Sequence, residues 1–151
     1  SGPLRIALIG AGRHAQHHAR AILRCPGVQL VAVADPSDAA QAAMRDIVPG
    51  IGCFKTPEEL FASEKLHVVH IITPPATHAP LARMALKAGC HIYVEKPFTE
   101  SVEDAQQLLD EASAKGLRVC AGHQLLYEPP TRVLTQYLPS IGRVVHVESY
   151  F

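Results

Sequence analysis

A glycine-rich turn near the start of the chain has the residues needed to hold the phosphates of a dinucleotide. Gly10 and Gly12 follow residues 4–9, an apolar run typical of a parallel strand that is buried on both faces. Arg13 and His14 open a helical pattern directly after them, so free N–H groups and the positive end of the helix dipole meet at the turn. The spacing predicts a site for negative charge there.

An acidic residue extends this prediction from phosphate to a dinucleotide. Ala15 replaces the third glycine of a Gly-x-Gly-x-x-Gly pattern and is small enough for the helix to lie close to the strand. Asp35 ends a second apolar run 23 residues beyond Gly12 (35 − 12), near the roughly 20-residue spacing of an acid that hydrogen-bonds an adenine ribose. A carboxylate there repels a 2′-phosphate, which favours NAD over NADP, although Arg13 and Ser37 leave NADP open. Taken alone, Asp35 could equally be a helix cap or a turn residue.

Lys96 is the candidate catalytic residue. It follows a short apolar run, stands beside Glu95 and precedes Pro97. A cation at a strand end can polarise a substrate oxygen or transfer a proton. The alternative for this tripeptide is an exposed lysine paired with Glu95.

Histidines near the glycine turn raise the question of a metal site. His14 and His18 lie four residues apart on one helix, with His17 between them, but no third ligand with a defined spacing follows. We therefore predict no metal site and expect His18 to pack under the glycine loop with a hydrogen-bonded ring. His78, which begins a later helix, either contacts the cofactor side of the cleft or caps that helix.

The remaining sequence alternates strand-like and helix-like segments that can position these residues. Apolar runs predict strands over residues 28–34, 52–54, 67–73, 90–94 and 117–121, and helical patterns cover residues 38–46, 57–63, 81–88 and 101–115. Such alternation is typical of an α/β fold with a Rossmann-type, doubly wound parallel sheet. Its ligands lie beyond the carboxyl ends of the strands. The fold thus gathers residues 10–14, 35, 73–75, 95–97 and 122–124 along one rim.

Composition narrows the classes of protein. The chain has 151 residues, 48% of them hydrophobic, and a formal net charge of zero, so we expect one domain with a sizeable core and no general attraction to nucleic acid or membranes. No apolar run is long enough to span a membrane. The four cysteines form no Cys-x-x-Cys pair, which favours reduced thiols in a cytoplasmic protein.

The ordered motifs resemble the N-terminal domain of the Gfo/Idh/MocA oxidoreductases, the family of glucose-fructose oxidoreductase and inositol dehydrogenase. They are Gly-Ala-Gly at residues 10–12, Val-Ala-Asp at 33–35, Thr-Pro-Pro-Ala-Thr-His at 73–78, Ala-Leu-Lys-Ala-Gly at 85–89 and Glu-Lys-Pro at 95–97. The resemblance implies an NAD(P)-binding Rossmann domain over residues 1–122. It also implies a connecting helical segment over 123–139 and, at 140–151, the start of a truncated C-terminal α+β domain for substrate binding and oligomerisation, with residues 141–151 as its first strand.

The resemblance also implies roles for individual residues. Lys96 matches the family's active-site lysine and, with Glu95, faces the nicotinamide and the substrate. The Lys96–Pro97 bond is often cis in this family, and Gln124 matches a family Asn or Gln. The candidate cofactor-binding residues are Gly10, Gly12, Arg13, His14, Asp35, Thr73, Pro74, His78, Glu95, Lys96 and Gln124.

Two positions depart from the family pattern. Pro75 stands where Asn is usual, and Leu126 stands where Arg is usual. Contacts that the family makes through those two side chains are therefore lost.

These observations favour the cofactor domain of an NAD(P)-dependent oxidoreductase. The full-length enzyme is expected to be a homo-oligomer that transfers hydride between nicotinamide and a sugar, polyol or nucleotide-sugar derivative, whereas this chain alone is expected to be inactive. The alternative is a non-catalytic dinucleotide-binding module that senses NAD or scaffolds a partner.

Overall fold

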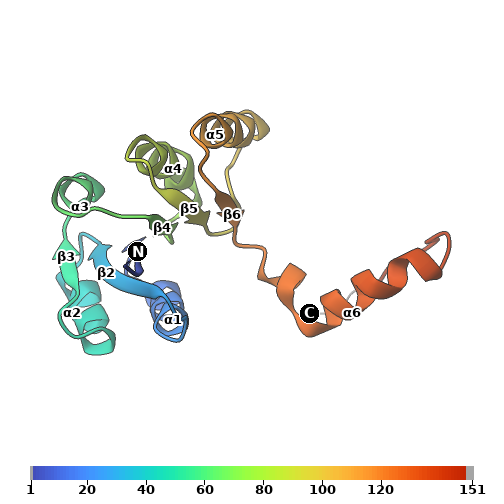
Figure 1. Cartoon of the computed structure of the whole chain (residues 1–151), viewed down its shortest axis with the longest axis horizontal. Helices are drawn as coiled ribbons and strands as arrows, with labels where there is room; N and C mark the ends of the chain where they lie inside the picture. Colours follow the sequence, from blue (N-terminus) through green and yellow to red (C-terminus); the bar gives the residue numbers. More distant parts are fainter. Residues whose placement is uncertain (1, 149–151) are drawn as a thin grey trace.

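The computed structural model describes residues 2–148 and contains a six-stranded parallel sheet with helices on both faces (Figure 1). The strands lie in the order β3-β2-β1-β4-β5-β6. Their bounds are β1 Leu4–Ile9, β2 Val28–Ala34, β3 Gly52–Phe54, β4 Val68–Ile71, β5 His91–Val94 and β6 Val119–Ala121. The helices are α1 Arg13–Ile22, α2 Asp38–Ile47, α3 Pro57–Ser63, α4 His78–Lys87, α5 Val102–Ala114 and α6 Pro129–Tyr137. The predicted doubly wound α/β fold is confirmed.

Each face of the sheet has its own hydrophobic core. The helices α1 and α2 cover one face, and α3, α4 and α5 cover the other (Figure 1). Ala15 and Ala19 of α1 are completely buried, together with Met44 of α2. Leu86 of α4 and Leu108 of α5 are as deeply buried on the opposite face. The small residue at position 15 therefore brings α1 close to the sheet, as predicted.

The strands end level with one another. Ile9 pairs with Ala34 of β2 and with Ile71 of β4, and the last residues of β3, β5 and β6 continue the same row. The residues that follow the strands consequently share one rim, as the sequence predicts. Because the strand order reverses between β1 and β4, this rim contains the crevice where ligands of such sheets bind.

Three strands are shorter than predicted, for local reasons. β4 ends at Ile71 because Thr73 and Pro74 turn away, and proline has no N–H for the ladder. The backbone N–H groups of Cys90 and Leu117 bond to the ends of the preceding helices α4 and α5, at Ala85 O and Ala112 O respectively. β5 and β6 therefore begin one and two residues later than predicted.

The segment after β6 extends away from the sheet (Figure 1). It contains short helical turns and α6, none of whose residues is buried. The strand expected over residues 141–151 is not formed at 141–148, because no strand lies beside those residues to complete its hydrogen bonds; residues 149–151 lie outside the described residues. Within residues 2–148, every helix is too short or too polar to cross a membrane.

Candidate cofactor-binding site

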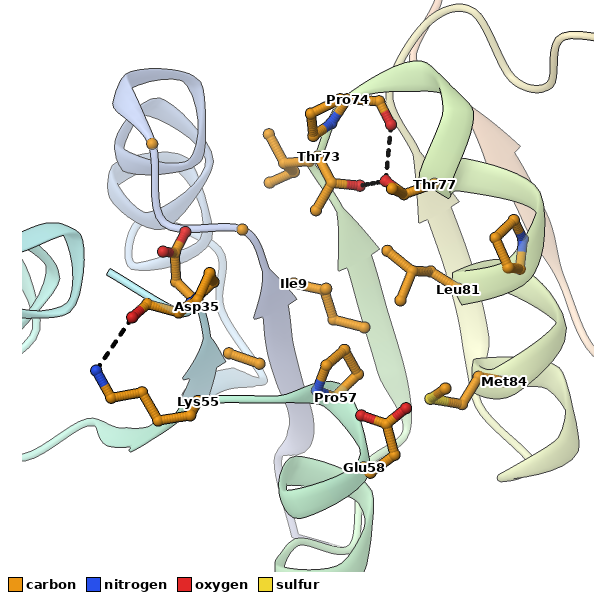
Figure 2. Close-up of a pocket in the computed structure, with 16 residues that line it drawn as sticks. Ile9, Asp35, Lys55, Pro57, Glu58, Thr73, Pro74, Thr77, Leu81 and Met84 are labelled. Atoms are coloured by element: carbon orange, nitrogen blue, oxygen red, sulfur yellow. Dashed lines mark hydrogen bonds between the residues drawn. The ribbon is translucent and has the colours of Figure 1, made fainter. Parts of the chain in front are cut away.

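A pocket opens on the rim at the junction of β1 and β4. Its volume of about 650 Å³ is within the range of small-molecule sites. Gly10, Gly12, Asp35, Thr73 and Pro74 line it, so the fold brings these five predicted cofactor residues together (Figure 2). Most of the remaining lining is apolar and includes Ile9, Pro57, Leu81 and Met84. Such a surface suits a flat base, with the polar groups of the turn at its edge.

Gly10 lies so close to Ile72, the residue after β4, that a side chain at position 10 would not fit. Gly10 has a φ of +97°, and a Cβ atom on it would lie 2.4 Å from the carbonyl oxygen of Ile72. α1 begins directly after Gly12, and no side chain caps it. The N–H groups of its first turn are therefore available to an anion, as the spacing predicts.

Asp35 braces this turn. One carboxylate oxygen accepts a hydrogen bond from the N–H of Ala11 at 2.7 Å, and the other accepts from the N–H of Ser37 at 2.8 Å. The helix cap is Ser37, whose hydroxyl accepts from the N–H of Ala40, so Asp35 is a turn residue and not a cap. Its remaining lone pairs face a pocket in which ribose hydroxyls can reach them.

Sequence reasoning missed two polar side chains near Asp35. Lys55, which follows β3, places its Nζ 2.6 Å from the carboxylate of Asp38 and 3.1 Å from a carbonyl of the β2–α2 turn. Gln41 is buried in α2 and donates to the carbonyls of Asp35 and of the last residue of β3. The position of Gln41 on the buried face of the predicted helix could have indicated that it forms internal hydrogen bonds. No local spacing links Lys55 to Asp38.

His78 does not reach the pocket. Its ring is buried, with Nε2 2.8 Å from the carbonyl oxygen of Thr73 and Nδ1 2.7 Å from that of Pro97. The ring therefore faces these two carbonyls and does not line the pocket, and the side chain does not cap α4 either. The ring instead joins the loop after β4 to the segment that carries Lys96. Because carbonyls only accept, a neutral imidazole donates to one of them at a time.

Replacing His78 by glutamine is expected to loosen these two segments. The flexible glutamine side chain lacks the ring that spans the two carbonyls and loses more rotamer freedom when it is held between them, so we expect the free energy of unfolding in urea to fall by about 1–2 kcal/mol. The exposed His123 provides the control, since His123→Gln should change stability by less than about 0.5 kcal/mol. Equal stability of both variants would contradict the bridging role.

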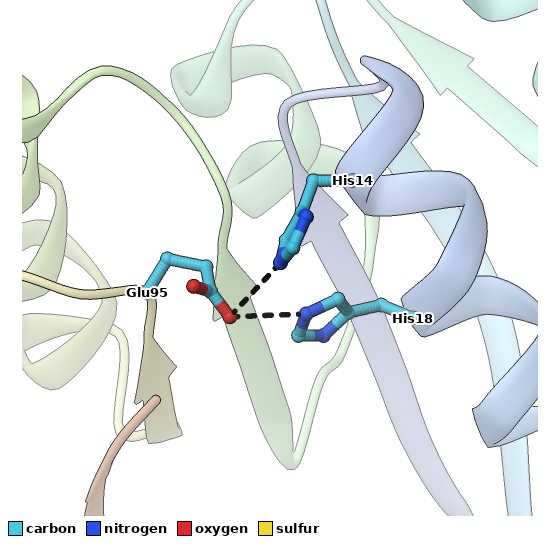
Figure 3. A group of neighbouring side chains, drawn as sticks. All are labelled: His14, His18 and Glu95. Atoms are coloured by element: carbon cyan, nitrogen blue, oxygen red, sulfur yellow. Dashed lines mark hydrogen bonds and ion pairs between the residues drawn. The ribbon is translucent and has the colours of Figure 1, made fainter. Parts of the chain in front are cut away.

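A second group of polar side chains lies at the ends of β4 and β5 and on α1. Oε1 of Glu95 is 3.2 Å from His18 Nε2 and accepts the hydroxyl of Tyr93 at 3.2 Å. The other ring nitrogen of His18 is 3.1 Å from Nδ1 of His70. The predicted hydrogen-bonded ring of His18 is confirmed. Figure 3 also shows His14 pointing to the same oxygen of Glu95. The distance from that oxygen to His14 Nε2 is 3.6 Å.

Burial determines the charge of this group. Burial, with a smaller contribution from His18, lowers the pKa of His70 to about 4. Burial likewise lowers the pKa of His18, against the opposing effect of Glu95. Burial and the carboxylate of Glu95 raise the pKa of Tyr93 to about 12. At neutral pH, His70 is therefore uncharged and Tyr93 is a hydrogen-bond donor.

Gly122 makes room for this group. A Cβ atom at that position would lie 2.9 Å from both Oε1 of Glu95 and the hydroxyl of Tyr93. The sequence places Gly122 on the rim but indicates no role for it, because the approach involves a different strand.

The buried neutral His70 predicts a dependence of stability on pH. Its pKa is about 4 in the folded chain and near 6.5 when unfolded, so the unfolded chain binds the extra proton between these values. The stability that the neutral His70 contributes is therefore present above pH 6.5 and is lost as the pH falls toward 4. From pH 7 to pH 5 we expect a loss of about 2 kcal/mol. Urea unfolding in metal-free buffer should show a smaller loss for His70→Gln than for the unaltered chain; identical profiles would contradict the assignment.

The other predicted site residues are exposed and outside the pocket. Arg13 lies on the outer side of α1, and Gln124 begins a helical turn after β6. Lys96 is exposed, and its bond to Pro97 is cis, as predicted. Within residues 2–148, Lys96 and Glu95 form no ion pair; the carboxylate accepts instead from the backbone N–H of Lys96. Lys96 is thus free to contact a ligand.

The sheet order, the uncapped glycine turn and the braced acid define a Rossmann-type dinucleotide-binding domain. Residues 4–123 match the model of the Gfo/Idh/MocA family, described as an oxidoreductase family with an NAD-binding Rossmann fold. The chain belongs to this family, and NAD is its cofactor class. The resemblance inferred from the motifs is confirmed.

Known proteins agree with this assignment. The chain is 30% identical to an oxidoreductase from Escherichia coli, YdgJ, in an alignment that covers 100% of the chain and 44% of YdgJ. It is 35% identical to an inositol 2-dehydrogenase from Agrobacterium fabrum, over 77% of the chain and 35% of the relative. The structure of GenD2 from gentamicin A biosynthesis in complex with NAD aligns with a TM-score of 0.80 and 29% identity, over 85% of the chain and 37% of GenD2. The chain therefore spans less than half of these proteins.

Proposed function

We propose that the full-length protein is an NAD-dependent oxidoreductase that acts on a CH–OH group of a sugar, polyol or nucleotide sugar. The observation that carries the proposal is the common rim, which places the cofactor pocket and the exposed Lys96 on one edge of the sheet. Relatives include the inositol dehydrogenase above and a UDP-N-acetylglucosamine 3-dehydrogenase from Acidithiobacillus ferrooxidans, 31% identical over 88% of the chain. Their names support the substrate class.

Different residues along the rim bind different parts of the cofactor. The N–H groups at Gly12, Arg13 and His14 hold the pyrophosphate, and Asp35 holds the adenine ribose. Its charge disfavours a 2′-phosphate, so NAD is preferred to NADP. Thr73 and Pro74 would line the cofactor on the side of the pocket that faces β4.

The reacting end lies beside β5 and β6. When bound, NAD supplies the hydride acceptor or donor. Glu95 and Gln124 contact the nicotinamide side, and Lys96 stabilises or protonates the substrate oxygen. A base from outside these 151 residues completes the proton transfer.

The rest of the protein is part of the same proposal. Residues 123–139 connect the domain, which covers residues 1–122, to a C-terminal substrate domain that begins within 140–151. Exposed apolar side chains on and after α6, among them Val133, Leu134 and Tyr137, suit a segment that packs against further chain. The assembled enzyme is a cytoplasmic homo-oligomer, and the chain of 151 residues alone does not turn over substrate.

A substrate panel tests the activity. The full-length protein is incubated with NAD and inositols, glucosides or UDP-sugars, and NADH formation is followed by absorbance. We expect turnover with at least one of these classes and less with NADP. Tight binding of NADH without turnover of any CH–OH substrate would instead support the non-catalytic module.

A further inference from the structure

Three potential metal ligands meet at the edge of the sheet. His14 and His18 of α1 and Glu95 after β5 each offer one ligand atom, and these three atoms lie within 4.8 Å of one another. Figure 3 shows both rings directed at the carboxylate. The spacing of the two histidines indicates no third ligand, because Glu95 lies 77 residues beyond His18 and only the fold joins them.

Two of the three distances between the ligand atoms are close to those around a tetrahedral ion. Bonds of about 2.0–2.1 Å place neighbouring ligand atoms about 3.3 Å apart. Oε1 of Glu95 is 3.2 Å from His18 Nε2 and 3.6 Å from His14 Nε2. The ligand nitrogens of the two histidines lie within 4.8 Å of each other, and the side chain of His14, which is 60% exposed, can move to shorten that distance. Two imidazoles and one carboxylate are also the ligand set of open zinc sites.

The surrounding hydrogen bonds suit metal-binding forms of these side chains. A histidine that binds metal through one nitrogen usually donates the N–H of the other to a fixed acceptor. The second nitrogen of His18 is 3.1 Å from Nδ1 of His70, which can accept that proton. Glu95 is held by the hydroxyl of Tyr93 and by the backbone N–H of Lys96. Two of the three ligands are thus held in place before any ion binds.

We propose that His14, His18 and Glu95 bind a divalent transition-metal ion of the zinc class, with a coordination position left open to water. The exposed side of His14 gives an ion access to the three ligands. Bound there, the ion lies at the same end of the rim as Lys96. This inference does not depend on the proposed oxidoreductase activity.

Metal titration of the purified 151-residue chain tests the site. Zn²⁺ binding is measured by calorimetry, and Co²⁺ binding by the visible absorption of a four- or five-coordinate complex. We expect one saturable ion per chain. His14→Ala and Glu95→Gln each remove a ligand and should weaken binding by at least about tenfold. His70→Gln changes only the residue that hydrogen-bonds to His18 and should weaken binding by about tenfold. Circular dichroism verifies that each variant is folded.

His17 provides the matched control, because it is an exposed histidine on the same helix outside the ligand set. His17→Ala should leave the affinity for Zn²⁺ within about twofold of the unaltered chain, far from the effect of losing a ligand. Absence of saturable binding would overturn the proposal, as would binding that His17→Ala weakens as much as His14→Ala. NADH binding is measured separately, so its presence or absence leaves this outcome distinct from that of the proposed function.

Discussion

Gly10→Ala is expected to lower the free energy of unfolding by about 3 kcal/mol. The left-handed backbone at φ +97° costs an alanine roughly 1–2 kcal/mol. Its Cβ would also lie 2.4 Å from the carbonyl oxygen of Ile72, so β1 or the loop after β4 must move, at a further cost of about 1–3 kcal/mol. The same movement displaces the anion site, so NADH affinity should fall together with stability.

Gly89 separates the two causes. It has a φ of +77°, but a Cβ atom added there would have no heavy atom within 4 Å, so Gly89→Ala carries the backbone cost without the clash. Urea unfolding should show a loss of about 1 kcal/mol for that variant. Equal losses for the two variants would show that the turn does not approach the neighbouring strand as closely as described.

Lys96→Met in the full-length protein is expected to lower kcat by roughly 10²–10⁴-fold, the usual effect of removing a general acid or base. Lys96 is exposed on the rim and forms no ion pair with Glu95 in the described part of the chain. Its loss should therefore change NADH affinity little. Steady-state kinetics and NADH titration measure the two effects separately.

The control is Lys87→Met, an exposed lysine at the far end of α4. It should leave both kcat and NADH affinity unchanged. If Lys96→Met also retains full turnover, Lys96 has no part in the mechanism, and the acid must come from another group.

The rim was predictable because its parts depend on local patterns. Apolar runs indicate where parallel strands end, and level strand ends bring Gly10, Asp35 and Glu95 to one edge. The packing of α1 followed from small residues at helical spacing. Strand limits were less accurate where Leu117 completes a helix end, because that choice depends on one hydrogen bond.

Contacts between distant segments could not be predicted from spacing. His78 points inward because two carbonyls from different loops meet its ring. Glu95 approaches His18 only when β5 lies two strands from β1, and Gly122 must then be small to admit both Glu95 and Tyr93. The strand expected after residue 140 requires a partner that residues 2–148 do not supply.

Titration of the 151-residue chain with NADH is the most direct test of the cofactor pocket. Nicotinamide fluorescence reports binding, and a ligand of the folded state must also raise the Tm as its concentration increases. The structure predicts saturable binding of one NADH, weaker binding of NADPH, and a Tm that rises with each addition. A folded chain whose fluorescence and Tm do not respond to NADH would contradict the assignment of the turn, Asp35 and Thr73 as a working cofactor site.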